Sequence, residues 1–372
     1  VMTKISIQMD SAEYARQDAV EVVERKGYGH PDTLCDRISE LTSVLYSQYC
    51  IENFGKIGHH WFDKVMLIGG EANLGFGVGE LTSPYEVILA GKAATSIGEV
   101  EIPLTRIFEN AARKVLLDTL HYFNPSTDLL ITNRIKSGRG PGQPVSRYRP
   151  ISANEMAAID EPELVSNDCN LCTAYYPLST LEEVVLSIDH EFLKENEARW
   201  FGLIGSDIKT VGWRRYSNYT LAVNAPFLAK KVYSRTDYIK HCEDLEKNIH
   251  DWVSSRWEID ITVTVNPERK WKRSYLTLTG TVADTGDVGV TGRGNRMNGL
   301  ITPGRNMSIE AVAGKNPLDH TGKLYNALAY DLAKAIYYKI SSPCKVSIST
   351  LKGVPLNCPI EITVSVSNSI HT

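Results

Sequence analysis

The sequence predicts an α+β fold made of three related units, each a β-sheet covered by helices. Two observations lead to this prediction. Three times along the chain a β-rich segment runs into a strongly amphipathic helix, and similar segments recur at roughly 120 to 150 residues, far longer than the period of a solenoid repeat. A chain of 372 residues has room for two or three domains of ordinary size. Three sheet-and-helix units are therefore the simplest arrangement.

The first predicted helix follows His30, Pro31 and Asp32. Its apolar residues recur every three or four positions and form one stripe: Leu34, Ile38, Leu41, Leu45 and Tyr49. A carboxylate at the start of a helix can accept hydrogen bonds from free backbone amides. We therefore expect Asp32 to cap this helix.

The second and third predicted helices begin at residues 179–183 and at about Gly322. In the second helix, Thr180 and Glu183 have the spacing of a capping box. Its expected apolar face comprises Leu181, Val184, Val185, Ile188 and Phe192. In the third helix, the residues spaced for an apolar face are Leu324, Leu328, Leu332 and Ile336.

Alternating, β-branched runs predict strands at residues 64–70, 129–132 and 275–280. Residues 136–150 are dense in Gly, Pro, Ser and Arg, which predicts a mobile surface loop. We place the unit boundaries near residues 125 and 264. This gives an N-terminal unit (1–125), a central unit (126–264) and a C-terminal unit (265–372).

The composition is that of a globular protein with a core, since 42% of the residues are hydrophobic and 23% are charged. The net charge is −4, which argues against bulk electrostatic binding to nucleic acid or to an anionic membrane. No apolar stretch approaches the roughly 18 residues of a membrane helix, and residues 1–18 lack the apolar segment of a signal peptide. Seven scattered cysteines do not suggest a disulfide framework, so we expect a cytoplasmic protein.

A glycine-rich segment, residues 286–305, is followed by a second stretch at residues 313–323. Glycines allow tight turns and bring backbone amides close to an anion. Side chains that can donate to phosphates recur along both stretches: Arg293, Arg305, Lys315, His320 and Lys323. No Walker A pattern occurs, which excludes an ordinary P-loop. The residue types indicate a phosphate site, and the alternative is a solvent loop with unpaired cations.

Two shorter segments add candidates. In residues 24–32, His30 and Asp32 stand at a helix start, where the macrodipole favours anions. Asp32 can hold Mg²⁺ and His30 can donate a proton or hydrogen bond to a leaving oxygen, whereas the alternative is a plain N-cap with an exposed histidine. In residues 205–209, strand alternation would place Asp207 and Lys209 on one face, where a surface ion pair would look the same.

Two further patterns are not expected to bind metal. Cys169 and Cys172 have the spacing of half a zinc site, but no second pair or thioredoxin-like context lies nearby. His59 and His60 would point to opposite faces of a strand. The basic run at residues 269–273 is expected to be a solvated hairpin turn rather than a nucleic-acid contact.

Three strings resemble the archaeal-type methionine adenosyltransferases, the S-adenosylmethionine synthetases. They are residues 23–33 (VERKGYGHPDT), residues 292–303 (GRGNRMNGLITP) and residues 313–317 (AGKNP), the last followed by His320, Gly322, Lys323, Tyr325 and Asn326. The strings are long and occur in the expected order. The likeness extends over about residues 20–340.

The resemblance implies the S-adenosylmethionine synthetase fold, in which three α/β-sandwich domains are interleaved with pseudo-threefold symmetry. It also implies a homodimer with active sites between the subunits, and Mg²⁺ and K⁺ as cofactors. The sulfur of L-methionine would attack C5′ of ATP and displace the triphosphate, which is then hydrolysed to pyrophosphate and phosphate. A neutral thioether needs no general base, so catalysis would depend on positioning and on stabilising a highly charged leaving group.

The same resemblance assigns roles to residues of this chain. His30 would hydrogen-bond the departing oxygen and Asp32 would bind Mg²⁺. The triphosphate would be neutralised by Lys209, Arg293 and Lys315. The further substrate-binding positions are Asp168 and Asp207 at the nucleotide, Asp287 and Glu71 at the methionine ammonium, and His320 and Lys323.

Several residues depart from the archaeal pattern. They are Val288 for an acidic residue, Cys172 and Ala174 for glycines, Trp61 for a smaller residue, Asp319 for asparagine, Arg37 for glycine and Asn306 for proline. The added bulk at Cys172 and Ala174 falls where backbone would pass close to adenosine. The alternatives are a specialised paralogue that uses a methionine analogue or another nucleotide, an enzyme acting mainly as a triphosphate hydrolase, and a catalytically silent binding subunit.

Overall fold

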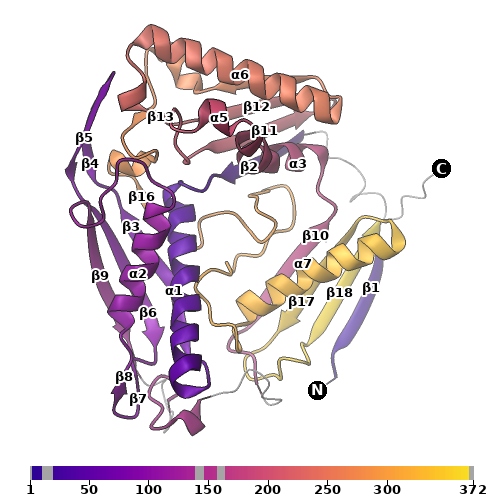
Figure 1. Cartoon of the computed structure of the whole chain (residues 1–372). Coiled ribbons are helices and arrows are strands. Elements are labelled where there is room, and N and C mark those ends of the chain that lie inside the picture. Colours follow the sequence, from indigo (N-terminus) through magenta and orange to yellow (C-terminus); the bar gives the residue numbers. More distant parts are fainter. Residues whose placement is uncertain (1, 11–19, 139–145, 157–163, 368–372) are drawn as a thin grey trace.

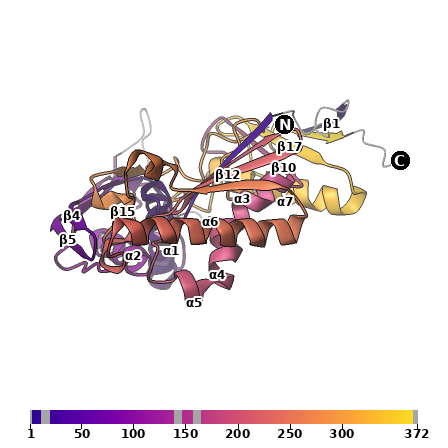
Figure 2. The ribbon, with the colours of Figure 1, turned by 90° about the horizontal axis from the view of Figure 1, so that it is seen from above.

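The computed structural model describes residues 2–10, 20–138, 146–156 and 164–367, and its frame is three four-stranded sheets (Figure 1). Seen from above, the long helices lie along one side of the molecule and the sheets along the other (Figure 2). The predicted α+β class is therefore confirmed. One face of each sheet is covered by helices, and the opposite face points away from them.

The first sheet packs against α1 (Pro31–Phe54), and α2 (Leu104–Leu117) lies beside α1. Its strands, in spatial order, are β16 (Val288–Val290), β3 (His60–Ile68), β6 (Tyr85–Ala93) and β9 (Leu129–Lys136). The predicted stripe of α1 faces this core: Leu34 and Ile38 are fully buried, and Leu41, Leu45 and Tyr49 pack against them at its edge.

The second sheet is covered by α3 (Thr180–Ser187) and α6 (Arg235–Trp257). Its strands are β14 (Ile261–Val265), β12 (Asn218–Asn224), β11 (Lys209–Arg215) and β2 (Val20–Lys26). After α3 the chain continues through a π-helical turn (Ile188–Phe192), α4 (Leu193–Glu195) and α5 (Glu197–Trp200). The apolar face predicted from Leu181 to Phe192 is confirmed, because all five of its residues are fully buried.

The third sheet is covered by α7 (Thr321–Ile340). Its strands are β1 (Lys4–Asp10), β18 (Glu361–Ser367), β17 (Cys344–Thr350) and β10 (Asn170–Tyr176). The predicted face of α7 is confirmed in part, because Leu324, Leu332 and Ile336 pack against the core at its edge, whereas Leu328 is 41% exposed. The buried apolar residues of the helix are Tyr325, Ala329 and Ala333. Small alanines let the helix approach the sheet closely, so the leucines lie on its flank.

Strands are exchanged between the units. The first strand, β1, pairs in parallel with β18 near the C-terminus, β2 pairs with β11, and β16 pairs with β3. Each four-stranded sheet thus takes strands from at least two of the three predicted segments. The described residues also form three small two-stranded sheets: β4 (Glu71–Gly75) with β5 (Val78–Ser83), β7 (Ser96–Ile97) with β8 (Val100–Glu101), and β13 (Phe227–Leu228) with β15 (Leu276–Thr277).

Two predicted helix starts are wrong by one or two residues. The N-cap of α1 is His30 and not Asp32, which lies inside the first turn. The capping box of α3 is formed by Ser179 and Glu182, not by Thr180 and Glu183. At α3 hydroxyl and acidic residues follow one another, so more than one pair has capping chemistry. At α1 the cap is the imidazole of His30, whose Nδ1 accepts from the backbone N–H of Asp32.

Other local predictions also need correction. The strand predicted at residues 275–280 shrinks to β15, and residues 267–271 form a 3-10 helix where a hairpin turn was expected. The strand predicted at residues 129–132 extends to Lys136, and residues 139–145 of the predicted loop lie outside the described structure. Of the helices in the described ranges, none combines the length and the apolar character needed to span a membrane.

Candidate active site

One face of α1 binds the glycine-rich segment through a row of acidic side chains. Asp32, Asp36 and Glu40 are spaced by four residues and so lie on one side of the helix. Each carboxylate accepts a hydrogen bond from a backbone amide of the glycine-rich stretches: Asp32 from Val290 (2.9 Å), Asp36 from Gly292 (2.8 Å) and Glu40 from Gly314 (2.9 Å). These amides were predicted to bind a ligand anion, and instead they bind carboxylates of the protein.

Glycine is required where this segment touches the helix. A Cβ on Gly289 would lie 2.1 Å from the carbonyl oxygen of Pro31, and one on Gly294 would lie 2.1 Å from a carboxylate oxygen of Asp36. Both approaches are far closer than any real Cβ contact. The glycines therefore let the segment lie directly on the first turns of α1.

His30 stands at the start of α1, with its imidazole largely buried. Its Nδ1 accepts a hydrogen bond from the backbone N–H of Asp32 (3.1 Å), so the proton of a neutral ring is on Nε2. Burial lowers the pKa of His30 to about 4, and the cations Lys26, Lys209 and Arg293 act in the same direction. At neutral pH His30 is therefore an uncharged hydrogen-bond donor through Nε2.

Asp32 is buried and ionised. One of its oxygens accepts from the amide of Val290, and the other accepts from the ammonium of Lys26 at 2.8 Å. Burial alone would raise the pKa of Asp32, but these hydrogen bonds and the charge of Lys26 outweigh it and lower the pKa. Among the described residues, no three His, Cys, Asp or Glu side chains gather to form a ready-made metal site.

Lys209 and Arg293, the two predicted cations near His30, differ in their surroundings. Lys209 is the first residue of β11 and lies 3.2 Å from a carboxylate oxygen of Glu24 on the neighbouring strand β2. Arg293 follows β16 and has an exposed side chain. Both are close enough to His30 to act on its pKa, so the structure brings these three predicted residues together.

Asp207 does not share a strand face with Lys209 as predicted, because it lies before the start of β11. Its buried carboxylate accepts hydrogen bonds from the amide of Val282 (2.9 Å) and the hydroxyl of Thr281 (3.2 Å). Burial raises the pKa of Asp207 to about 6, and the nearby negative charge of Asp287 adds to the rise. Asp207 and Asp287 thus form an acidic pair.

The acidic pair is attached to the turn that carries His30. The amides of Gly27 and Gly29 donate to the carbonyl oxygens of Ile208 (2.7 Å) and Ser206 (2.9 Å). Glu71 is held near Asp287 by the backbone, since it forms an isolated β-bridge with Thr285, two residues before Asp287. Glu71 and Asp287 are both exposed.

A second cationic cluster lies further along α1. Lys315 is buried, and its ammonium is 3.4 Å from Asp63 and 3.3 Å from Glu310. Lys323 lies 2.7 Å from Glu40 on α1. Glu40 is eight residues beyond Asp32, so the two cationic clusters are about 12 Å apart along the helix.

His320 and Asp168 flank this second cluster. His320 is the N-cap of α7, where its Nδ1 accepts from the amide of Gly322 (3.2 Å). Burial lowers the pKa of His320 to about 3, with Lys315 acting in the same direction, so its ring is neutral. Asp168 is exposed and accepts from the amide of Cys169 (2.8 Å), while the preceding residue, Asn167, accepts from the amide of Thr321 at the start of α7.

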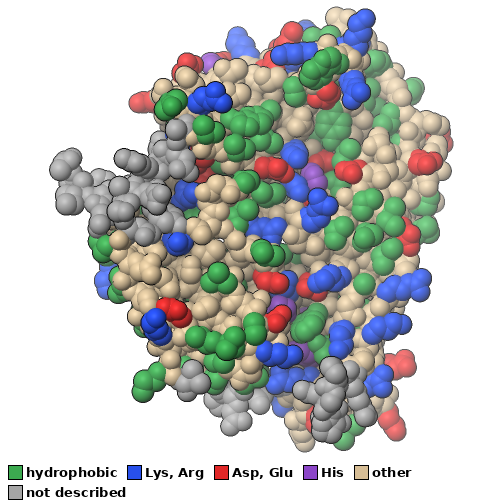
Figure 3. Space-filling view, turned by 180° about the vertical axis from the view of Figure 1, so that it is seen from behind, with side chains coloured by type: hydrophobic (Ala, Val, Ile, Leu, Met, Phe, Trp, Pro, Cys, Tyr) green, Lys and Arg blue, Asp and Glu red, His purple; other side chains and the backbone are tan. Residues whose placement is uncertain are grey.

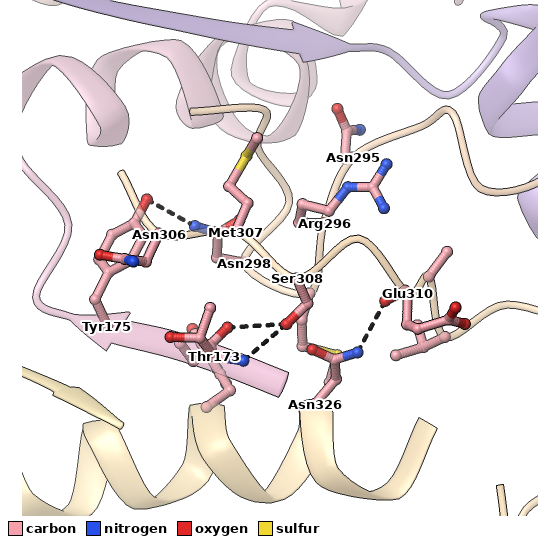
Figure 4. Close-up of a pocket in the computed structure, with 15 residues that line it drawn as sticks. Thr173, Tyr175, Asn295, Arg296, Asn298, Asn306, Met307, Ser308, Glu310 and Asn326 are labelled. Carbon is pink, nitrogen blue, oxygen red and sulfur yellow. Dashed lines mark hydrogen bonds between the residues drawn. The ribbon is translucent and has the colours of Figure 1, made fainter. Parts of the chain in front are cut away.

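A pocket opens between β10, the glycine-rich segment and α7, and it is lined by Glu310, a partner of Lys315 (Figure 4). Most of its lining side chains are polar, and they include Asn295, Asn298, Ser308, Glu310 and Asn326. Two of the residues that depart from the archaeal pattern, Ala174 and Asn306, line it as well. Cys172 does not, because it is turned toward α7 and buried in the core of the third sheet.

The other departures have defined partners. The carboxylate of Asp319 accepts from Arg147 at 2.6 Å, and Arg37 donates to the hydroxyl of Thr119 at 2.7 Å. Trp61 packs its ring against His320, with the centroids 5.6 Å apart. The remaining departure, Val288, is in β16 and is partly exposed.

Sequence reasoning missed Asp36, Glu40, Asp63, Glu310 and Lys26. Asp36 and Glu40 carried a signal, because they follow Asp32 at intervals of four on a predicted helix. In the sequence Asp63 is notable only with His59 and His60 as a metal pattern, and its pairing with the distant Lys315 depends on the tertiary fold. Figure 3 shows the face opposite the long helices, where acidic, basic and histidine side chains gather along the middle.

The fold and the site define a class of α+β proteins in which three helix-backed sheets present a charged, histidine-containing face. A family model described as S-adenosylmethionine synthetase (AdoMet synthetase) matches residues 3–371. The chain belongs to this family.

Named relatives are similar over most of their length. The S-adenosylmethionine synthase of Aeropyrum pernix is 37% identical over 374 residues, covering 97% of this chain and 89% of that protein. That of Caldivirga maquilingensis is 36% identical over 356 residues, covering 93% and 85%. The probable S-adenosylmethionine synthase of Aquifex aeolicus is 38% identical over 333 residues, covering 87% and 79%.

A solved structure shares the fold. The chain of an unusual S-adenosylmethionine synthetase from Campylobacter jejuni superposes with a TM-score of 0.58 at 15% sequence identity, over 93% of this chain and 80% of that one. At this low sequence identity, the likeness shows that the two proteins share a fold.

Proposed function

We propose that the protein is a methionine adenosyltransferase that makes S-adenosylmethionine from ATP and L-methionine. The observation that carries this proposal is the neutral His30, whose Nε2 proton is free of its capping bond and is surrounded by Lys26, Lys209 and Arg293. Such an arrangement suits a hydrogen bond to an oxygen that becomes negatively charged. Family membership supplies the reaction.

In the reaction, the sulfur of methionine forms a bond to C5′ of ATP and the bond from C5′ to its oxygen breaks. The electron pair leaves with the triphosphate, and the sulfur becomes a sulfonium. His30 donates its Nε2 hydrogen bond to the departing oxygen, and a pKa near 4 means that it need not give up a proton. Water then hydrolyses the triphosphate to pyrophosphate and phosphate.

The two cationic clusters suit an elongated, multiply charged leaving group. Lys209 and Arg293 near His30 would neutralise one end, and Lys315 with Lys323 would neutralise the other, about 12 Å away along α1. Lys315 and Lys323 are each paired with carboxylates, which holds their side chains in place. His320, neutral and beside Lys315, would donate a hydrogen bond at the same end.

The negative charge around Asp287 suits the ammonium group of methionine. Burial is the main reason that the pKa of Asp207 is raised, and repulsion by the nearby charge of Asp287 adds to the rise. An ammonium between them would relieve this repulsion. We assign the methionine ammonium to Asp287 with Glu71, the nucleotide to Asp207 and Asp168, and the triphosphate to the cationic clusters.

Mg²⁺ and K⁺ are proposed as cofactors. The residues fit a Mg²⁺ that arrives with the nucleotide, because Mg²⁺ commonly takes one or two protein carboxylates together with phosphate oxygens. Asp32 is ionised and supplies such a carboxylate. When bound, the ion would neutralise triphosphate oxygens. The proposal for K⁺ rests on the family resemblance.

We also propose a homodimer with active sites between the subunits. On the face away from the helices, each sheet shows a large apolar side chain: Met66 on β3, Trp213 on β11 and Leu171 on β10, each at least 40% exposed. Exposed apolar residues of this kind are typical of protein interfaces. A cytoplasmic location is proposed because all seven cysteines are free thiols.

The proposal is tested by incubating the purified protein with ATP, L-methionine, Mg²⁺ and K⁺ and analysing the products by mass spectrometry. One S-adenosylmethionine, one phosphate and one pyrophosphate per turnover are expected. Phosphate release without the sulfonium product would reject the transferase. Sedimentation of the same sample tests the dimer, which a monomer at micromolar concentration would contradict.

One observation favours a second candidate, a paralogue that accepts a larger methionine analogue or another nucleotide. Ala174 and Asn306 line the pocket between β10, the glycine-rich segment and α7, at positions where the archaeal pattern has glycine and proline. Changing these residues to the family residues, Ala174→Gly and Asn306→Pro, would then raise kcat/KM for methionine. If methionine is already used as efficiently as by the relatives, the second candidate is rejected.

A further inference from the structure

Lys26, the last residue of β2, has a buried ammonium with two strong partners. Its Nζ donates to the carboxylate of Asp32 (2.8 Å) and to the backbone carbonyl oxygen of Arg293 (2.7 Å). The side chain is 11% exposed. Lys26 thus connects the predicted Mg²⁺ ligand with the backbone of a predicted triphosphate ligand.

The backbone of Lys26 is held by the same turn. Its N–H donates to the side-chain oxygen of Asn295 (3.0 Å), and the side-chain nitrogen of Asn295 donates back to the Lys26 carbonyl (2.8 Å). The hydroxyl of Thr33 on α1 also donates to this carbonyl (3.3 Å). One residue therefore joins the end of β2, the first turn of α1 and the turn at residues 293–295.

Core packing alone does not explain a lysine here. Burying an ammonium is costly, and a methionine of similar length would fill the same space. The carbonyl of Arg293 and one oxygen of Asp32 are accepting groups that converge on a single point, and a cation satisfies both. The charge also adds to the positive potential around His30, together with Lys209.

We propose that Lys26 is a positioning residue of the triphosphate site, which sets the Asp32 carboxylate and the Arg293 turn in place before the nucleotide binds. This assignment rests on the proposed function and extends it to a residue outside the predicted site. A fixed ammonium at this point lowers the reorganisation needed when the leaving group becomes charged. Its charge favours binding of the triphosphate, and its position favours the chemical step.

The test separates charge from position with two variants. Lys26→Met removes the charge and both hydrogen bonds, whereas Lys26→Arg keeps the charge and displaces it. Lys114→Met is the matched control, because Lys114 is exposed and paired with Asp118 at a similar distance (2.9 Å). Titration calorimetry measures the affinity for inorganic tripolyphosphate with Mg²⁺, steady-state assays give kcat and KM for ATP, and circular dichroism verifies folding.

We expect Lys26→Met to weaken tripolyphosphate binding by at least about 10-fold and to lower kcat by about 10². Lys26→Arg should keep the affinity within about threefold and still lower kcat by about 10-fold. Wild-type affinity in a folded Lys26→Met variant would overturn the assignment. Should that variant fail to fold, wild-type kcat in Lys26→Arg would overturn it instead.

The outcomes distinguish this assignment from the proposed function. If the wild type binds tripolyphosphate through Lys26 but makes no S-adenosylmethionine, the proposed function fails and the assignment of Lys26 stands. If the wild type makes S-adenosylmethionine and Lys26→Met is unchanged in affinity and kcat, the assignment alone fails.

Discussion

Replacing Asp207 with asparagine should stabilise the protein at neutral pH. The carboxyl is buried, and its pKa is raised from 3.8 to about 6. Two pKa units correspond to about 3 kcal/mol of penalty on the ionised form in the folded state. The amide of asparagine carries no charge, and its oxygen can still accept from Val282 and Thr281, which both donate to the same carboxylate oxygen.

The sign of the pH dependence follows from proton binding. Because the folded state holds the Asp207 proton more tightly than the unfolded state, the carboxyl stabilises the fold below about pH 4. That contribution is lost as the pH rises through about 6. The advantage of Asp207→Asn over the wild type should therefore grow by about 1 kcal/mol between pH 5 and pH 8, and level off above that range.

Urea unfolding of both proteins at a series of pH values measures this difference. Asp118→Asn is the control, since Asp118 is an exposed acid paired with Lys114, and its difference from the wild type should stay nearly constant. A free-energy difference for Asp207→Asn that does not change with pH, or that shrinks as the pH rises, would refute the reasoning.

Three further predictions follow from single residues. His30→Ala removes the Nε2 donor and should lower kcat by about 10² to 10³ in a steady-state assay. In the wild type, the pH–rate profile should show no titration of His30 between pH 6 and 8, because its pKa is about 4. Gly289→Ala places a Cβ 2.1 Å from the carbonyl of Pro31 and should cost at least about 1 to 3 kcal/mol of stability in urea unfolding; unchanged stability would mean that the contact is absent. Arg305→Ala leaves the buried Glu182, 3.4 Å away, without its ion-pair partner and should lower stability by about 2 kcal/mol or more, a loss that Glu182→Gln in the same background should partly restore.

The helices were predictable because their apolar spacing is local information. The stripe that begins at Leu34 and the one that begins at Leu181 both face their cores. The third stripe was right only in part, because close packing of the helix favours small residues whereas the sequence pattern favours large ones: Ala329 is buried where Leu328 was expected. The predicted helix starts were wrong by one or two residues because several neighbouring side chains are able to cap a helix.

Strand partners were not predictable from local patterns. Pairing of β1 with β18 and of β2 with β11 joins segments far apart in the chain, and register depends on the tertiary structure. The same limit applies to the site. His30, Arg293 and Lys315 were identified through motifs, but the motifs say nothing of what each side chain contacts. The spacing of Asp32, Asp36 and Glu40 placed three carboxylates on one side of α1, but nothing in the sequence showed that they would bind the amides of the glycine-rich segment.

The central claim is that the enzyme breaks the bond between C5′ and its oxygen in ATP. The most direct test uses ATP that carries ¹⁸O at this bridging position, with L-methionine, and follows the label by mass spectrometry. We predict unlabelled S-adenosylmethionine and one ¹⁸O per turnover in the inorganic products, in the pyrophosphate or in the phosphate according to which end of the triphosphate is hydrolysed. Label retained in a nucleoside or nucleotide product would mean that a phosphorus–oxygen bond is cleaved instead, and would contradict the account.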